Sequence, residues 1–154
     1  MLHQTKMQTL IGWITITFGG ALYLAQIISS INFPLAQRLG IQERPETSDV
    51  LLQRSERYTA YWDLFTLLWL PIAGILMIID HPWWPVIALI GGAIYLDAAG
   101  REAAKSLSFR HEGMRIGSKF EQRAYFACYI IMAAIALLVI VFSVLHISVR
   151  GITV

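Results

Sequence analysis

Apolar and polar positions divide the chain into long uncharged runs separated by charged stretches. Between Asp63 and Asp80 there are 16 residues without a formal charge, and 16 more lie between Asp80 and Asp97. If both runs are helical, a rise of about 1.5 Å per residue places Asp63 and Asp97 about 25 Å from Asp80. This length is close to the hydrocarbon thickness of a bilayer, so the pattern predicts a transmembrane hairpin with spans at about 62–79 and 84–100.

The turn of this hairpin and two further runs complete the pattern. Residues 80–85 read Asp-His-Pro-Trp-Trp-Pro; prolines do not continue a helix, and tryptophans favour the boundary between membrane and water. Residues 7–37 carry no formal charge, and the stretch 124–148 carries none either. These runs predict a first span at about 9–33, ended by Pro34, and a fourth span at 124–148.

Composition supports a membrane protein. The 154 residues are 56% hydrophobic and 14% charged, with a mean hydropathy of +0.59, whereas about a quarter of the residues of a soluble domain are charged. The prediction is an all-α integral membrane protein, a four-transmembrane-helix bundle that forms a single membrane domain over residues 1–154. The single cysteine, Cys128, excludes an intramolecular disulfide and a thiolate metal cage.

Charge predicts the orientation of the bundle. The two connectors, 34–61 and 101–123, hold ten of the twelve Lys and Arg residues. The positive-inside rule then places both connectors in the cytoplasm and both termini on the non-cytoplasmic side. We expect the plasma membrane of a bacterium, its inner membrane, as the location. A net charge of +2 is too small to indicate a nucleic-acid partner.

Local signals in the connectors predict where helices begin and end. Residues 47–49, Thr-Ser-Asp, can cap a helix that starts at Val50 and runs into the second span. Residues 111–113, His-Glu-Gly, end an extension of the third helix. Ser118 and Glu121 have the spacing of a capping box, which predicts the start of the fourth helix.

Small and polar residues recur along one side of the first span. Gly12, Thr15, Gly19, Gln26 and Ser30 lie at spacings of three, four and seven, so they form one stripe. Such a stripe lets helix backbones approach each other in lipid, and we interpret it as a packing face in preference to the lining of a pathway.

A short similarity links the first and third spans. Residues 19–24 read Gly-Gly-Ala-Leu-Tyr-Leu and residues 91–96 read Gly-Gly-Ala-Ile-Tyr-Leu. A duplicated two-helix unit produces such a pattern, and so does chance in a membrane sequence that draws on few residue types. Chance is the interpretation we favour.

Ionisable residues at the predicted cytoplasmic boundary form the candidate binding site, because such groups near a bilayer mark functional sites by default. The candidate residues are Arg57, Tyr61, Asp63, Tyr95, Asp97 and Arg101. Asp63 and Asp97 share one depth, and Arg101 is placed at i+4 to pair with Asp97. Two close carboxylates share a proton, whereas an Asp97–Arg101 pair can simply anchor the hairpin.

No catalytic residue can be assigned from motifs, because the sequence lacks the phosphate-binding, metalloprotease and serine-hydrolase patterns. His3, His81 and His146 fall on the predicted non-cytoplasmic side, but their spacing matches no ligand motif. We therefore expect no metal and no cofactor.

The layout loosely resembles that of the membrane-associated eicosanoid and glutathione metabolism proteins. Residues 54–57, Arg-Ser-Glu-Arg, lead into the second span, and Tyr95-Leu96 with Gly100-Arg101 ends the third. The resemblance covers residues 38–105 and implies a four-span fold that acts on an amphipathic substrate. Tyr61, Leu64 and Ala104 replace residues that the family's pattern has at these positions.

Three functions follow as hypotheses. The leading one is a non-catalytic bundle that serves as a subunit or scaffold of a membrane assembly, either a homo-oligomer or a larger membrane complex, with membrane lipids as its surroundings. The second is a membrane enzyme or binder for an amphipathic, lipid-like molecule at the cytoplasmic boundary. The third is a proton- or cation-linked transporter that uses Asp63 and Asp97.

Overall fold

The structure, a computed structural model, describes residues 2–150 and the side chains of residues 6–149. Helices dominate this part of the chain. Their bounds are α1 (Leu2–Ile31), α2 (Phe33–Arg38), α3 (Val50–Thr66), α4 (Trp69–Ile78), α5 (Trp84–His111) and α6 (Lys119–Arg150). A single β-bridge joins Ser48 to Ile116. The prediction of an all-α protein is confirmed for the described residues.

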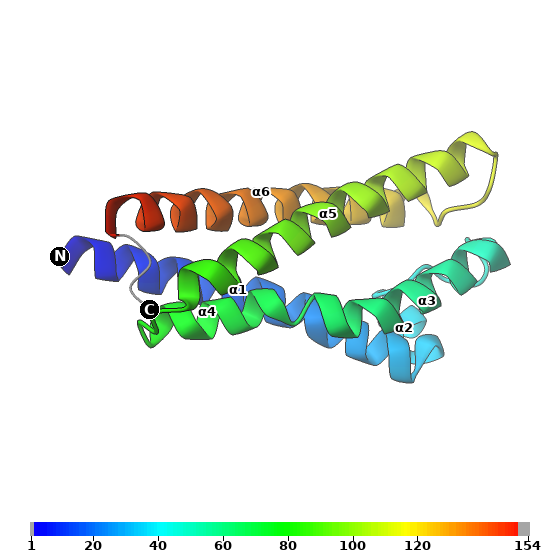
Figure 1. Cartoon of the computed structure of the whole chain (residues 1–154). Coiled ribbons are helices and arrows are strands. Elements are labelled where there is room, and N and C mark those ends of the chain that lie inside the picture. The colour runs from blue at the N-terminus through cyan, green and yellow to red at the C-terminus, as the bar shows by residue number, and fades with distance from the viewer. Residues whose placement is uncertain (1, 151–154) are drawn as a thin grey trace.

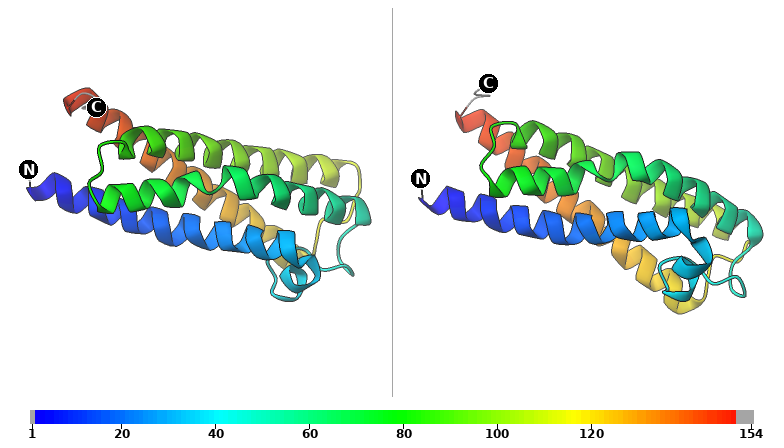
Figure 2. Two further views of the ribbon diagram at one scale, coloured as in Figure 1. Left: turned by 60° about the horizontal axis from the view of Figure 1, so that its bottom comes forward. Right: turned by 90° about the horizontal axis from the view of Figure 1, so that it is seen from below.

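The helices lie side by side in one elongated bundle (Figure 1). α1 packs along α4, α4 along α5 and α5 along α6, whereas α1 and α6 touch each other little. We call the end with the α4–α5 turn the turn end; α1 begins and α6 ends there (Figure 2). We call the opposite end, where α2 and the two connectors lie, the connector end.

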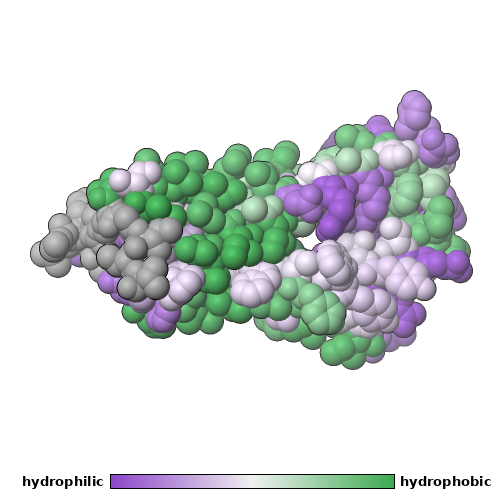
Figure 3. Space-filling view, in the orientation of Figure 1, coloured by the Kyte–Doolittle hydropathy of each residue, from purple (hydrophilic) through white to green (hydrophobic). Residues whose placement is uncertain are grey.

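Among the described residues, three helical segments are long and apolar enough to cross a membrane. They are Lys6–Ile31, Val50–Ile78 and Lys119–Val149. On the face shown in Figure 3, apolar side chains cover the half towards the turn end, and hydrophilic ones gather towards the connector end. Since a soluble domain rarely leaves such large apolar patches exposed, these segments indicate an integral membrane protein.

The first span ends two residues earlier than expected. α1 stops at Ile31, and Pro34 belongs to the first turn of α2 instead of following the span. The side chain of Asn32 explains the difference, because its oxygen accepts a hydrogen bond from the Leu35 N–H at 3.1 Å and caps α2. A proline in the first helical turn leaves no intrahelical donor missing, so Pro34 starts a helix here.

Glycines allow α1, α4 and α5 to approach closely near the turn end. A Cβ atom on Gly74 of α4 would lie 2.8 Å from the Gly12 carbonyl oxygen of α1. A Cβ on Gly91 of α5 would lie 2.9 Å from the backbone nitrogen of Leu70 in α4. At Gly12, the small-residue stripe of α1 packs against α4 of the same chain. The interpretation of the stripe as a packing face is confirmed at this position.

A break separates α3 from α4 at Leu67 and Leu68. Pro71 has no N–H to donate to the Leu67 carbonyl four residues earlier, so this acceptor is freed. The Tyr95 hydroxyl of α5 lies 3.1 Å from the Leu67 carbonyl oxygen and also 3.1 Å from the Gly19 carbonyl oxygen of α1, so it is the donor that Leu67 shares with Gly19. The Tyr23 hydroxyl of α1 donates to the Leu64 carbonyl oxygen at 3.2 Å. Side chains of the neighbouring helices thus satisfy the carbonyls of the break.

The two similar hexapeptides contact this break from both sides. Gly19 packs near Pro71, and Tyr23, four residues later, donates to the Leu64 carbonyl. Gly91 packs near Leu70, and Tyr95, four residues later, donates to the Leu67 carbonyl. The sequence similarity between 19–24 and 91–96 therefore corresponds to a similar structural role.

The connectors contain one confirmed capping motif and one that differs. Ser118 and Glu121 form the expected capping box, with the Ser118 N–H donating to Glu121 Oε2 at 2.6 Å and the Glu121 N–H to Ser118 Oγ at 3.2 Å. Asp49 occupies the N-cap position of α3 without a side-chain cap bond. Its carboxylate instead accepts hydrogen bonds from the backbone and side chain of Arg115, which ties the two connectors together. The backbone N–H of Arg115 and its guanidinium lower the pKa of Asp49 below the ordinary value.

Candidate functional site

The structure brings three of the candidate residues together between α3 and α5. Arg101 Nη2 lies 3.4 Å from Asp63 Oδ1, and Arg101 Nη1 lies 3.6 Å from Asp97 Oδ2. The Asp63 side chain is 4% exposed and faces the interior, whereas that of Asp97 is 73% exposed. One guanidinium thus bridges two aspartates that sit in different surroundings, an arrangement that differs from two carboxylates sharing a proton.

The other three candidates lie apart from this group. Arg57 and Tyr61 are on the exposed face of α3, where the Arg57 Nε–H donates to the Tyr61 hydroxyl at 3.2 Å. Tyr95 is fully buried nearer the turn end and serves the helix break through its hydroxyl. These positions give Tyr95 a packing role and leave Arg57 and Tyr61 outside the interior.

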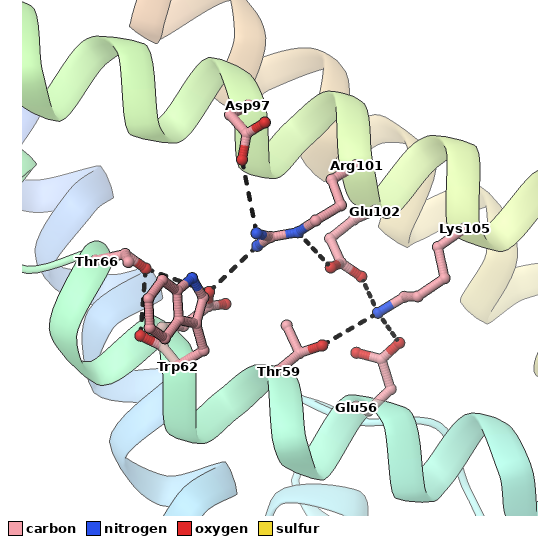
Figure 4. Close-up of polar contacts among 9 residues, drawn as sticks. Glu56, Thr59, Trp62, Thr66, Asp97, Arg101, Glu102 and Lys105 are labelled. Carbon is pink, nitrogen blue, oxygen red and sulfur yellow. Dashed lines mark hydrogen bonds and ion pairs between the residues drawn. The ribbon is translucent and has the colours of Figure 1, made fainter.

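A second ionic group continues from Arg101 along the same two helices (Figure 4). Lys105 Nζ lies 2.8 Å from Glu56 Oε1 and also contacts Glu102, and Arg101 Nε lies 3.6 Å from Glu102 Oε1. Burial by itself lowers the pKa of Lys105, but the negative charges of Glu56 and Glu102 outweigh it and raise that pKa above its ordinary value. Lys105 is therefore a fixed cation that offsets two largely buried carboxylates.

An acidic cavity adjoins this group inside the connector end. Its volume is about 110 Å³, and α1, α3, α5, α6 and the connector after α2 all contribute to its wall. Four carboxylates line it: Glu43, Glu56, Asp63 and Glu102. Apolar side chains form the larger part of the remaining wall, and a cavity of this size has room for several water molecules or for one small polar group.

Glu43 is the carboxylate of this cavity that lacks an ion pair within the described part of the chain. The other three are paired with Lys105 or Arg101, but Glu43 is only 7% exposed and no Lys or Arg among the described residues lies within ion-pair distance of it. Burial, and next the negative charge of Glu56, raise the pKa of Glu43 to about 7.

Three residues of the cavity wall carry buried polar atoms without hydrogen-bond partners. Gln26 Oε1, Tyr125 Oη and Glu102 Oε1 are buried and form no hydrogen bond in the structure, although Glu102 Oε1 does form the longer ion pair with Arg101. All three residues belong to the cavity wall. A buried polar atom without a partner costs about 1–3 kcal/mol, so the wall is built to contact a hydrogen-bonding group.

An apolar, open surface groove lies along α1 on the turn-end side of this cavity, with one wall residue on α6. The groove has a volume of about 530 Å³ and is lined by Trp13, Ile14, Thr17, Phe18, Ala21 and Ile135. On α1, Ala21 of the groove is followed directly by Leu22 of the cavity wall. On α6, Ile135 of the groove and Met132 of the cavity wall are one helical turn apart. The two hollows thus have neighbouring wall residues on both helices, although they share no lining residue, in the region where α1 and α6 make little contact.

Sequence reasoning identified Asp63 but missed the other three acidic residues that line this cavity, Glu43, Glu56 and Glu102. Glu56 and Asp63 are seven residues apart, a spacing that places both on one face of a helix. That spacing could have identified Glu56 as a partner of Asp63. Arg57 is rotated about 100° from Glu56 on the helix, which explains why it faces outward. No local signal marks Glu43, because only the folded connector brings it into the bundle.

Among the described residues there is no group of three His, Cys, Asp or Glu side chains arranged to hold a metal ion. His146 packs edge-on against Trp84, with ring centroids 4.6 Å apart. The side chain of His3 lies outside the described residues.

No protein-family model, curated protein or solved structure matches this chain. The fold and the site together place it in the class of helical integral membrane proteins with a polar cavity at one end of the bundle.

Proposed function

We propose that the protein binds an amphipathic, lipid-like molecule, with the apolar chain in the groove between α1 and α6 and the polar head in the acidic cavity. The observation that carries the proposal is that an apolar groove and a cavity lined by four carboxylates have neighbouring wall residues, at Ala21–Leu22 on α1 and at Met132–Ile135 on α6. Ligand sites are typically concave and mostly apolar, with a few polar groups that fix orientation.

The dimensions suit an extended alkyl chain. Trp13 in the groove and Gln26 in the cavity wall are thirteen residues apart on α1, which corresponds to about 20 Å along a helix. Trp13 and Ile14 are also exposed on the outer surface, so the groove opens towards the surrounding lipid. An amphipath dissolved in the membrane can therefore enter sideways.

In this proposal the chain crosses the membrane four times. α5, which lies along α4 and α6, forms the additional crossing, and the connector end faces the cytoplasm because it holds ten of the twelve Lys and Arg residues. The head of the ligand then sits at the cytoplasmic boundary.

The two other hypotheses have less support in the geometry. The small-residue stripe, on which the assembly hypothesis rested, packs Gly12 and Gly19 against α4 within the same chain. The transporter hypothesis required Asp63 and Asp97 to act as a pair, and Arg101 lies between them.

Tryptophan quenching in lipid nanodiscs tests the proposal. The probe is hexadecanol with a bromine at the end of its chain, because bromine quenches a tryptophan that it touches. The Trp13 signal, obtained as the difference between the wild-type protein and Trp13→Phe, should fall in a saturable way. Ala21→Phe fills the groove and should abolish saturation.

The matched control is Ala127→Phe, on the exposed surface of α6 and outside the groove lining. It should bind the probe as the wild type does. Quenching that rises in proportion to the probe in the bilayer, and equally in all three proteins, would show simple partition into lipid and contradict the proposal.

A further inference from the structure

We propose that the head recognised by the acidic cavity is a primary ammonium group, so that the ligand is a long-chain amine or a lipid with an amine head. This inference rests on the proposed function and specifies its ligand class. It starts from the unequal distribution of charge and of hydrogen-bond partners around the cavity.

Charge in and around the cavity favours a cation. The lining carries four carboxylates, and the described residues that pair with them are the two cations Lys105 and Arg101. Arg101 also pairs with Asp97 outside the cavity. Negative charge is therefore in excess, and it is concentrated at Glu43, which is 7% exposed and has no ion pair among the described residues. A buried carboxylate of this kind is stabilised by a cation placed beside it.

The unpartnered atoms favour a hydrogen-bond donor. Gln26 Oε1 and Glu102 Oε1 can only accept hydrogen bonds, and the hydroxyl of Tyr125 can accept one as well. A primary ammonium has three N–H donors and no acceptor. A carboxylate or phosphate head offers acceptors to a wall that already has too many of them, and a quaternary ammonium offers no donor.

The protein already contains one example of this recognition. The ammonium of Lys105 is held by Glu56, Glu102 and the Thr59 hydroxyl, the last at 3.5 Å. A ligand ammonium near Glu43 would find a second set of acceptors on the same cavity wall, from Glu43, Gln26 and Tyr125. The raised pKa of Glu43, about 7, agrees with a carboxylate that lacks its cation.

Three probes with the same brominated hexadecyl chain distinguish the heads: the amine, the alcohol and the carboxylic acid. Binding is measured in nanodiscs through the Trp13 signal at a pH of about 8, where the amine is still protonated. We expect the amine to bind at least about tenfold more tightly than the alcohol, and the acid to bind most weakly. Bulk partition of each probe is subtracted with Ala21→Phe.

Substitution of Glu43 links the preference to the cavity. Glu43→Gln should remove most of the preference for the amine, because it weakens binding of the amine far more than binding of the alcohol. Gln26→Leu, which removes an acceptor from a different element, should reduce the preference in the same direction. Glu46→Gln alters an exposed carboxylate of the same connector and should leave the preference as it is.

The outcomes separate the two proposals. If the three probes bind equally, or if Glu43→Gln and Gln26→Leu both keep the preference, the ammonium assignment is overturned and the groove proposal stands. If no probe binds above bulk partition, the cavity holds water only and the proposed function fails together with this inference.

Discussion

The two ends of the bundle use the same helices in opposite ways. Near the turn end, α1, α4 and α5 approach so closely that Gly74 and Gly91 have no room for a Cβ atom and Gly12 has very little. At the connector end, α1, α3, α5 and α6 stand apart around a cavity with an acidic lining. Where helix backbones meet at glycine, no other group fits between them, whereas buried carboxylates require cations and space around them.

The comparison shows that the closely packed helix contacts and the candidate binding cavity lie at opposite ends of the bundle. The close contacts of Gly12, Gly74 and Gly91 near the turn end involve only uncharged groups, so they do not change with pH. Those at the connector end are ionic, and their energy changes with protonation and with any group that enters the cavity. Substitutions at the two ends should therefore differ in their pH dependence as well as in size.

The largest effect is expected from Lys105→Met. This change leaves Glu56 and Glu102 without their shared ammonium, and loss of one partner from a buried ionic group destabilises a protein by about 3–5 kcal/mol. Unfolding in detergent mixtures, followed by circular dichroism, measures the change. The loss should shrink as the pH falls and the two carboxylates become neutral. A triple variant that adds Glu56→Gln and Glu102→Gln should recover most of the stability, and a loss that persists in it would contradict the ionic explanation.

A smaller effect, and one of opposite sign, is expected from Glu43→Gln. The pKa of Glu43 rises from 4.5 to about 7 on folding. A carboxyl of this kind contributes stability that is fully present below a pH of about 4.5 and is lost as the pH rises through about 7. At a pH of about 8 the variant should thus be more stable than the wild type by up to about 3 kcal/mol, and at low pH the two should be equal.

Unfolding of both proteins across this pH range measures the difference. The charged groups that face Glu43 are Glu56 on α3, Lys105 on α5 and Glu121 on α6. They are present in both proteins, so the difference isolates Glu43. A difference that stays constant with pH would rule out its assignment as the titrating group.

The smallest effect is expected from Gly91→Ala at the tightly packed end. The added Cβ would lie 2.9 Å from the Leu70 backbone, which can move only together with α4. Such overpacking destabilises by about 1–3 kcal/mol. Gly100→Ala on the same helix meets no atom within 4 Å and should stabilise α5 slightly. Neither change should depend on pH, and equal effects at the two positions would contradict the close-packing explanation.

Much of this fold could be predicted from the pattern of charges. The uncharged runs on both sides of Asp80 predict a hairpin, and the structure has α4 and α5 there. The capping box at Ser118 and Glu121 was predictable because both of its partners lie within one turn. Whether α5 crosses the membrane remains a prediction, since the segments long and apolar enough to do so are three others.

The candidate site was less predictable for a physical reason. The depth of Asp63 and Asp97 follows from counting residues, but the rotation of each helix follows from packing. Rotation turns Asp63 inward, Asp97 outward and Tyr95 into the core. Glu43 depends on the path of a connector whose ends are fixed by contacts far away in sequence, such as that between Asp49 and Arg115.

The helix break at Leu67 also bears on how the chain is inserted into a membrane. Alone in lipid, the α3–α4 segment would expose the carbonyl that Pro71 leaves without a donor, at a cost of several kcal/mol. The donor is Tyr95 of α5, a helix that is not among the segments apolar enough to span the bilayer by themselves. α5 thus supplies the hydrogen-bond donor that the α3–α4 segment lacks, and the α3–α4 segment supplies the apolar character that α5 lacks. We therefore expect the hairpin to leave the translocation machinery as one unit.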